Sequence, residues 1–231
     1  MKKLIATDFD GTFIRGGVID PGYHTDIRAF REAGGLFGFV TGRGTDFFDT
    51  IREYGVTADY LLLYNGSLLA LPDGSVVKEY LIPRQTFAAL ESFFAADPAV
   101  CAFDKTGNEP FYRHYYARYD TPELALEAAA EVNRLYGDRV TAFVNGVHVN
   151  IGKKGSGKTQ GVRDALTYFG LKEEEAAVFG DDFNDLDMIT ALNGWAVNTA
   201  RPEVLAKAPH VCESVAAQAK IFLSERNRSN P

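Results

Sequence analysis

The hydrophobic positions of this chain form short apolar runs that alternate with stretches of helical spacing. The apolar runs that we expect to form strands lie around Ile5 and at residues 36–40, 60–64, 176–179, 195–197 and 210–212. The segments that we expect to be helical are 22–33, 45–54, 158–169 and 186–192. Strands that alternate with helices predict an α/β fold, a Rossmann-like parallel sheet wound by crossover connections.

The middle of the chain has a different pattern. Pro72-Asp73-Gly74 separates two strand-like segments, 67–71 and 75–82, as in a hairpin. Beyond it we expect helices at 84–96 and 122–136 and strands at 100–103, 140–144 and 147–151, with the aromatic segment 111–119 between them. This mixture predicts a small α+β cap domain at 83–151, inserted into a core domain formed by 1–82 and 152–231. The aromatic segment is most simply the packing face of the cap, and a substrate-facing role for part of it is the alternative.

The first strand ends in Asp8-Phe9-Asp10-Gly11-Thr12. On a strand, the spacing of Asp8 and Asp10 directs both carboxylates to one face, and Gly11 lets the backbone pass close to whatever they hold. Two neighbouring carboxylates repel each other unless a cation or a proton lies between them. An ordinary turn is the alternative, because Asp, Gly and Thr are common turn residues. Taken alone, the motif leaves both interpretations open.

Polar motifs also follow the other predicted strands. They are Thr41-Gly42-Arg43, Asn65-Gly66 and Gly180-Asp181-Asp182-Phe183-Asn184-Asp185. In open parallel sheets, ligands bind at the carboxyl ends of the strands, so we expect these motifs to gather with Asp8 at one edge of the sheet.

Residues Gly152 to Thr159 match the phosphate-binding pattern G-x-x-x-x-G-K-[ST] of P-loop nucleotide triphosphatases. The 231-residue chain leaves only 72 residues after Thr159, too few for the βα units that such a sheet needs. This interpretation also gives the two N-terminal carboxylates no role. We therefore keep a P-loop enzyme as the less favoured alternative.

Composition and charge narrow the classes of function. The formal net charge of −7 argues against a general nucleic-acid binder, although a local cation still permits a small anionic substrate. Cys101 and Cys212 lie far apart, which favours reduced thiols, and the four scattered histidines make a zinc site unfavourable. No signal segment or membrane span is visible, so we expect a cytoplasmic protein that does not bind a membrane.

In order and placement, the motifs at Asp8, Thr41, Lys158 and Asp181 resemble those of the haloacid dehalogenase (HAD) superfamily of phosphohydrolases. The Asn65-Gly66 loop, the insert and the G-D-x-x-N-D form of the last motif resemble its Cof-like, sugar-phosphatase branch. Two features depart from the family: the glycine-rich Gly155-Ser156-Gly157 segment and an insert that is short for this branch.

The resemblance implies a role for each motif residue. Asp8 would be the nucleophile, Asp10 the general acid and base, and Mg²⁺ would be held by Asp8, the Asp10 backbone carbonyl and Asp181. The residues implied in binding phosphate or substrate are Thr41, Gly42, Arg43, Lys158 and Asn184, with Asp185 anchoring the metal site or the lysine. Arg43 is equally consistent with a structural role, and Lys153 and Lys154 are rivals for the role of Lys158.

These roles imply a Mg²⁺-dependent phosphomonoester hydrolase that forms an aspartyl-phosphate. Its expected partner is a small phosphorylated metabolite, with sugar phosphates first by resemblance. A phosphomutase of the same superfamily is the main alternative, and a non-catalytic metabolite-binding protein is a third that gives Asp10 no role. Monomer and homodimer both stay open.

Overall fold

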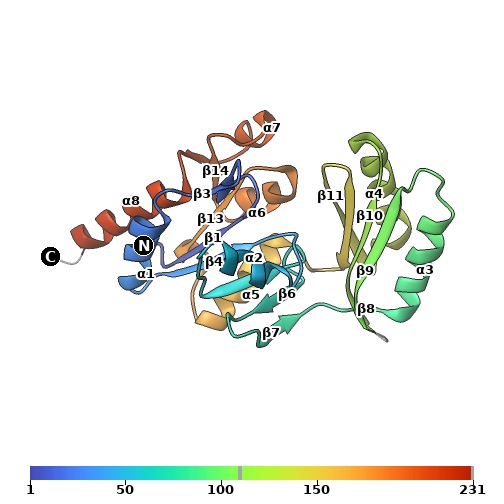
Figure 1. Ribbon diagram of the computed structural model, residues 1–231, viewed down its shortest axis with the longest axis horizontal. Coiled ribbons are helices and arrows are strands. Elements are labelled where there is room, and N and C mark those ends of the chain that lie inside the picture. The colour runs from blue at the N-terminus through green and yellow to red at the C-terminus, as the bar shows by residue number, and fades with distance from the viewer. Residues whose placement is uncertain (109–110, 230–231) are drawn as a thin grey trace.

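The larger of the two main sheets forms the centre of the core. The computed structural model describes residues 1–108 and 111–229 (Figure 1). The sheet has eight strands in the order β15-β14-β13-β1-β4-β5-β6-β7. In chain order these are β1 (Leu4–Thr7), β4 (Leu36–Val40), β5 (Tyr60–Leu63), β6 (Leu68–Ala70), β7 (Val76–Glu79), β13 (Ala176–Gly180), β14 (Trp195–Val197) and β15 (His210–Cys212).

The strands from β15 to β5 are parallel, which confirms the predicted α/β class. The hairpin formed by β6 and β7 adds two antiparallel strands at one edge, so the sheet is mixed. Helices cover both faces, as the burial of all four residues of β1 requires. Ile5 packs with α1 (Arg28–Glu32), α2 (Phe47–Glu53) and α8 (Val215–Ser229), whereas its neighbours Leu4 and Ala6 pack with α5 (Lys158–Phe169) and α6 (Leu186–Ala191).

Several local features of the core differ from the sequence-based expectation. The predicted helix 22–33 opens as a π-helical turn, η1 (Tyr23–Ile27), and only then becomes α1. A small hairpin of β2 (Ile14–Arg15) and β3 (Val18–Ile19) follows the Asp8 loop. The C-terminal helix α8 was not predicted. Its apolar residues at helical spacing, among them Ala219 and Phe222, pack into the core cluster. The remaining short helices are η2 (Glu173–Glu175), η3 (Phe183–Asp185) and α7 (Pro202–Leu205).

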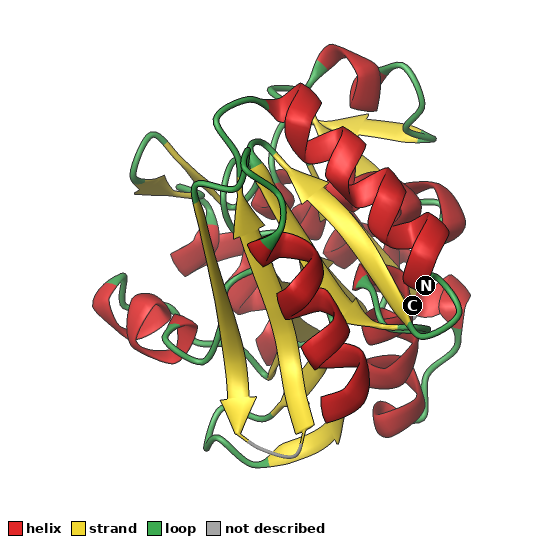
Figure 2. Cartoon of the chain, turned by 90° about the vertical axis from the view of Figure 1, so that its right-hand side faces the viewer, coloured by secondary structure: helices red, strands yellow, loops and turns green. Residues whose placement is uncertain are grey.

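The second unit, which we call the cap, consists of an antiparallel sheet and two helices (Figures 1 and 2). Its elements are β8 (Ile82–Pro83), α3 (Arg84–Ala95), β9 (Ala102–Asn108), β10 (Phe111–Arg118), α4 (Pro122–Tyr136), β11 (Val140–Asn145) and β12 (His148–Lys153). The sheet therefore begins one residue before the predicted boundary at 82/83 and continues two residues past the one at 151/152. The division into 1–82, 83–151 and 152–231 stays a prediction.

The two faces of the cap sheet have different neighbours. Tyr115, Ala117, Val149 and Ile151 are buried in a cluster with the apolar sides of α3 and α4. Side chains alternate along a strand, so the residues between them point to the opposite face. Tyr116, His148 and Asn150 lie on that face and line a cavity together with residues of the core. No helix in the described part of the chain is long and apolar enough to cross a membrane.

Candidate active site

Asp8 lies at the carboxyl end of β1, in the loop that follows the strand. Its backbone N–H donates to the Phe179 carbonyl of the neighbouring strand β13 at 2.9 Å, which fixes the loop at the sheet edge. The side chain is 7% exposed, and its Oδ1 accepts a hydrogen bond from Lys158 Nζ at 2.6 Å. Burial raises the pKa of Asp8 well above its usual value, while the Lys158 charge opposes this shift. The Asp8 side chain is therefore buried and held in one place beside a positive charge that favours its ionised form.

Lys158 is the first residue of α5, and its ammonium group joins two carboxylates. Nζ lies 2.6 Å from Oδ1 of Asp8 and 2.6 Å from Oδ1 of Asp185. Burial alone would lower the pKa of Lys158, but Asp185 and Asp8 raise it by more, so the lysine stays charged. Lys153 and Lys154 are exposed at the end of β12 and in the loop after it. The structure thus places Lys158 beside Asp8, and its role in holding phosphate stays a prediction.

The loop after β13 supplies two more carboxylates. Oδ2 of Asp185 accepts hydrogen bonds from the backbone N–H groups of Asp181 and Asp182 at 3.1 and 3.2 Å. Thr12 donates its hydroxyl to Oδ1 of Asp181 at 2.5 Å. A Cβ at Gly11 would lie 2.2 Å from Oδ2 of Asp181, so glycine is required where this loop meets the first one. The first and last sequence motifs therefore make direct contact.

Carboxylate oxygens of Asp8, Asp181 and Asp185 lie within 4.8 Å of one another. Only one ammonium group, that of Lys158, contacts this cluster within the described residues. Burial raises the pKa of Asp181 to about 6, even though the Thr12 hydrogen bond opposes the shift. The surplus negative charge and the all-oxygen donor set fit a hard divalent cation such as Mg²⁺. The predicted ligation by the Asp10 backbone carbonyl stays a prediction.

Asp10 is placed differently from Asp8. Because β1 ends at Thr7, both residues lie in the loop, yet both line the same cavity. The Asp10 side chain is 54% exposed and forms an ion pair with Arg43, whose Nε and Nη2 each lie 2.7 Å from one carboxylate oxygen. Phe9, between them, is fully buried among aromatic rings. The structure thus pairs the predicted general acid with the predicted substrate-binding arginine.

The remaining motif residues lie beside Asp8 at the sheet edge. Thr41 is 1% exposed, and its hydroxyl oxygen accepts a hydrogen bond from the Arg43 N–H at 3.1 Å. Asn184 donates its side-chain amide to Oδ1 of Asn65 at 3.4 Å, which joins the loop after β5 to the loop after β13. Gly42 lines the same cavity as Thr41 and Asn184. All predicted site residues therefore gather at one end of the sheet, and their individual roles stay predictions.

A cavity of about 390 Å³ opens between the cap and the carboxyl ends of the core strands. Four cap side chains line it, and the sequence analysis did not single them out: Tyr116, Asn145, His148 and Asn150. The alternation of side chains along β10 could have identified Tyr116 from the sequence. Tyr115 and Ala117 pack inside the cap, whereas Tyr116, between them, faces the cavity. The aromatic segment therefore packs inside the cap with one face and lines the cavity with the other, and its contact with substrate stays a prediction. The side chains of residues 106–112 lie outside the described ones.

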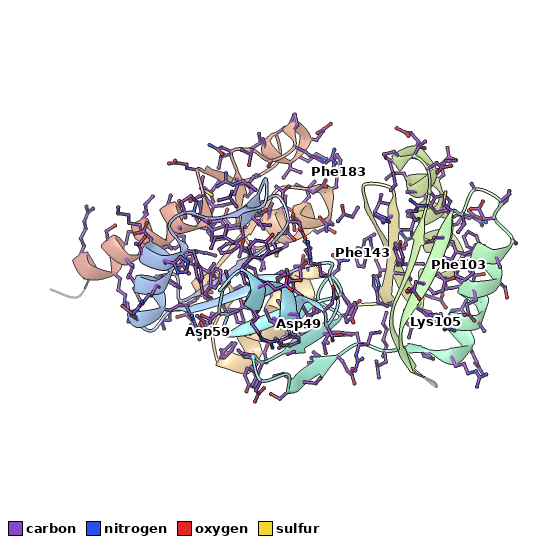
Figure 3. The ribbon with its side chains drawn as sticks, in the orientation of Figure 1. Asp49, Asp59, Phe103, Lys105, Phe143 and Phe183 are labelled. Carbon is purple, nitrogen blue, oxygen red and sulfur yellow. The ribbon has the colours of Figure 1, made fainter. Side chains whose placement is uncertain are left out.

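A second cavity, of about 660 Å³, lies between α4 and β11 of the cap and α5 and η3 of the core. Phe143 and Phe183, which face the boundary between cap and core in Figure 3, belong to its lining. So does the glycine-rich segment that matches the P-loop pattern. The strand before this segment, β12, pairs antiparallel with β10 and β11 in the cap sheet. It is therefore not the parallel strand from which a P-loop nucleotide site is built.

Several solved structures share this fold. BT1666 from Bacteroides thetaiotaomicron, a HAD phosphatase, is 19% identical with a TM-score of 0.79 over 98% of this chain and 95% of its own. A protein from Plasmodium vivax, described provisionally as a HAD/COF-like hydrolase, is 17% identical with a TM-score of 0.81 over 97% and 96%. The HAD subclass IIB sugar phosphatase BT4131 is 18% identical with a TM-score of 0.76 over 99% of both chains. At these identities the likeness concerns the fold.

The sequence itself matches a family model. The model of the haloacid dehalogenase-like hydrolases matches residues 5–121 and 98–219, which together include every motif described above. This match confirms the predicted superfamily and the prediction of an enzyme, and the Cof-like and sugar-phosphatase branch supplies structures of the same fold. The chain belongs to the haloacid dehalogenase-like hydrolase family.

Proposed function

We propose that this chain is a Mg²⁺-dependent phosphomonoesterase that transfers the phosphoryl group of its substrate first to Asp8 and then to water. One observation carries the proposal. The buried Asp8 carboxylate lies at the floor of a cavity, 2.6 Å from Lys158 Nζ and within a cluster that also contains Asp181 and Asp185. A fixed, partly neutralised carboxylate facing a polar cavity is suited to in-line attack on a phosphate monoester.

In the first step, an oxygen of Asp8 bonds to phosphorus, and the bond from phosphorus to the ester oxygen breaks. The electron pair leaves with that oxygen, and Asp10 donates a proton to it, so that an alcohol is released. Thr41 accepts from the Arg43 N–H, which leaves its own hydroxyl proton to be donated to a phosphate oxygen. Lys158 offsets the charge that develops beside Asp8.

In the second step, water attacks the phosphorus of the aspartyl-phosphate. Asp10, now a carboxylate, takes a proton from this water, and the bond between phosphorus and Asp8 breaks. Inorganic phosphate leaves and Asp8 is restored. The Mg²⁺ ion would be held by Asp8 and Asp181, with the Asp10 carbonyl, and supplies charge neutralisation of the phosphate oxygens.

The cap wall of the cavity supports sugar phosphates as the substrate class. Tyr116, Asn145, His148 and Asn150 offer a phenol, two amides and an imidazole, which are groups that hydrogen-bond hydroxyls. No Lys or Arg from the described part of the cap lines this cavity, so the described cap wall offers no fixed cation for a second anionic group. The fold shared with the sugar phosphatase BT4131 points to the same class.

Phosphate release tests the proposal. Glucose 6-phosphate, glycerol 2-phosphate, p-nitrophenyl phosphate and ATP are offered to the wild type, to Asp8→Asn and to the matched control Asp187→Asn, with Mg²⁺ or with EDTA. We expect release from the monoesters that needs Mg²⁺, falls at least about 10³-fold in Asp8→Asn and persists in the control, since the nucleophile has no substitute. ATP-selective hydrolysis that survives Asp8→Asn would contradict the proposal. Formation of an isomeric sugar phosphate without phosphate release would favour the mutase.

A further inference from the structure

Both backbone polar groups of Arg43 form hydrogen bonds within the site. Its N–H donates to the Thr41 hydroxyl oxygen at 3.1 Å, and its carbonyl accepts from the Tyr64 N–H at 2.9 Å. The guanidinium carbon lies 5.4 Å from the centre of the buried Phe9 ring, within the range of a cation–π contact. The arginine therefore starts from a loop that is fixed by hydrogen bonds, and its side chain passes over the ring of Phe9, the residue between Asp8 and Asp10.

The guanidinium group binds the Asp10 carboxylate with two parallel hydrogen bonds. Nε lies 2.7 Å from Oδ2, and Nη2 lies 2.7 Å from Oδ1. Such a bidentate pair fixes the plane of the carboxylate as well as its position. The side chains are 40% and 54% exposed, so the pair lies at the cavity wall, where screening by solvent limits its contribution to stability. The main effect of the pair is therefore to fix the orientation of the Asp10 carboxylate.

Without Arg43, the Asp10 side chain would be free to rotate. The backbone around it is fixed, because the Gly11 N–H donates to the Ile14 carbonyl at 2.9 Å and Asp10 forms a bridge with Ile14. The carboxylate itself, however, receives both of its hydrogen bonds from Arg43 within the described residues. A general acid must lie within hydrogen-bond reach of the leaving oxygen, and a misplacement of about 1 Å can cost about 10²-fold in rate.

We propose that Arg43 is a positioning residue that orients the Asp10 carboxylate toward the leaving group, rather than a ligand of the transferred phosphate. This inference rests on the proposed role of Asp10 as general acid. It separates two functions within the Thr41-Gly42-Arg43 motif: the first two residues face the phosphate, and the third acts through Asp10. The arginine then matters most for leaving groups that need a proton.

A pair of substrates that differ in leaving-group basicity tests this role. Phenyl phosphate releases a basic phenolate that needs protonation, whereas p-nitrophenyl phosphate is nearly the same shape and releases a stable anion. We compare kcat/KM for both esters in wild type, Asp10→Asn, Arg43→Gln, Arg43→Lys and the double variant Asp10→Asn/Arg43→Gln. The inhibition constant of inorganic phosphate is measured in parallel, and thermal melting confirms that each variant is folded.

If Arg43 positions Asp10, Asp10→Asn lowers kcat/KM by about 10²-fold or more for phenyl phosphate and by a few-fold for p-nitrophenyl phosphate. Arg43→Gln shows the same selectivity with a loss of about 10- to 100-fold. Arg43→Lys recovers part of the loss, because one of the two hydrogen bonds is restored. The double variant is no worse than Asp10→Asn alone, and its inhibition constant for phosphate stays within about twofold of wild type, as expected for residues that act as a unit.

Equal losses for both esters, additive effects in the double variant or a raised inhibition constant for phosphate would instead make Arg43 a phosphate ligand and overturn the inference. If Asp10→Asn is selective but Arg43→Gln is not, the positioning role fails while the proposed function stands. If Asp10→Asn itself shows no selectivity, the acid role of Asp10 and the inference fall together.

Discussion

The two walls of the active-site cavity are built in different ways. On the core side, charged groups are buried and paired: Asp8 and Asp185 share the ammonium group of Lys158 in contacts of 2.6 Å. On the cap side, the lining groups are uncharged or imidazole side chains on the open face of an antiparallel sheet, such as Tyr116 and His148. The rings of these two residues lie 5.4 Å apart and are only partly buried.

This difference indicates that the core wall and the cap wall have different functions. The core wall is fixed by contacts among loops at the ends of parallel strands, so a change there disturbs both the charge balance and the fold. The cap wall is one face of a sheet whose other face forms the cap's own core, so its exposed positions can change without unfolding the unit. We therefore expect core variants to lose the chemical step and cap variants to change substrate preference.

The largest expected effect follows from removing the charge that joins the core carboxylates. Lys158→Met leaves Asp8 and Asp185 buried beside each other without a counter-ion, which should cost about 3–5 kcal/mol in the free energy of unfolding. We also expect kcat to fall by about 10³-fold, because an oriented Asp8 is lost. Urea unfolding and phosphatase assays measure the two effects. The control is Lys154→Met in the exposed loop, and a comparable loss there would make Lys154 the functional lysine.

A smaller effect should follow from a change in the cap wall. Tyr116→Ala removes a ring that lines the cavity, so we expect KM for a hydrolysed sugar phosphate to rise about tenfold, with kcat within about threefold of wild type. The inhibition constant of inorganic phosphate should not change, since we propose that phosphate binds the core wall. Tyr168→Ala, on the exposed side of α5, is the matched control. A fall in kcat with unchanged KM would contradict the division between the two walls.

The smallest effect concerns pH and the contact between cap and core. His114 of β10 is buried beside Tyr64 of the core, with ring centres 5.7 Å apart, and burial lowers its pKa from 6.5 to about 4. Between pH 6.5 and pH 4, His114 is protonated in the unfolded chain but not in the folded one. The free energy of unfolding therefore falls as the pH drops from 6.5 to 4, by about 3 kcal/mol at most.

His114→Phe should remove this part of the pH dependence while retaining a ring against Tyr64. Melting temperatures of wild type and variant, measured from pH 7 to pH 4, should converge or cross as the pH falls. His24→Phe, at an exposed position, is the control and should keep the dependence of the wild type. Parallel curves for wild type and His114→Phe would show that His114 becomes exposed and protonated without opening the structure.

Much of the fold could be predicted because its signals are local. The alternation of apolar runs with helical spacing indicated the α/β class, and the helices Pro122–Tyr136 and Lys158–Phe169 have the bounds that the pattern predicted. Helix α8 was missed although Val215, Ala219 and Phe222 lie at helical spacing, because three of the apolar residues in this segment are alanines, which contribute little to a hydrophobic pattern. The edge hairpin was recognised as a hairpin, but its membership of the large sheet depends on pairing between β5 and β6.

The sequence by itself determined the fold class, the superfamily and the residue types of the site. Each of these depends on short contiguous stretches of sequence, such as a strand and the motif that directly follows it. Only the tertiary structure decided which side chains meet. Lys158 contacts Asp8 across 150 residues, Arg43 is bound to Asp10, and Tyr116 rather than Tyr115 faces the cavity. These contacts depend on how sheets, loops and cap pack together, and local spacing along the chain carries no information about distances between segments that far apart.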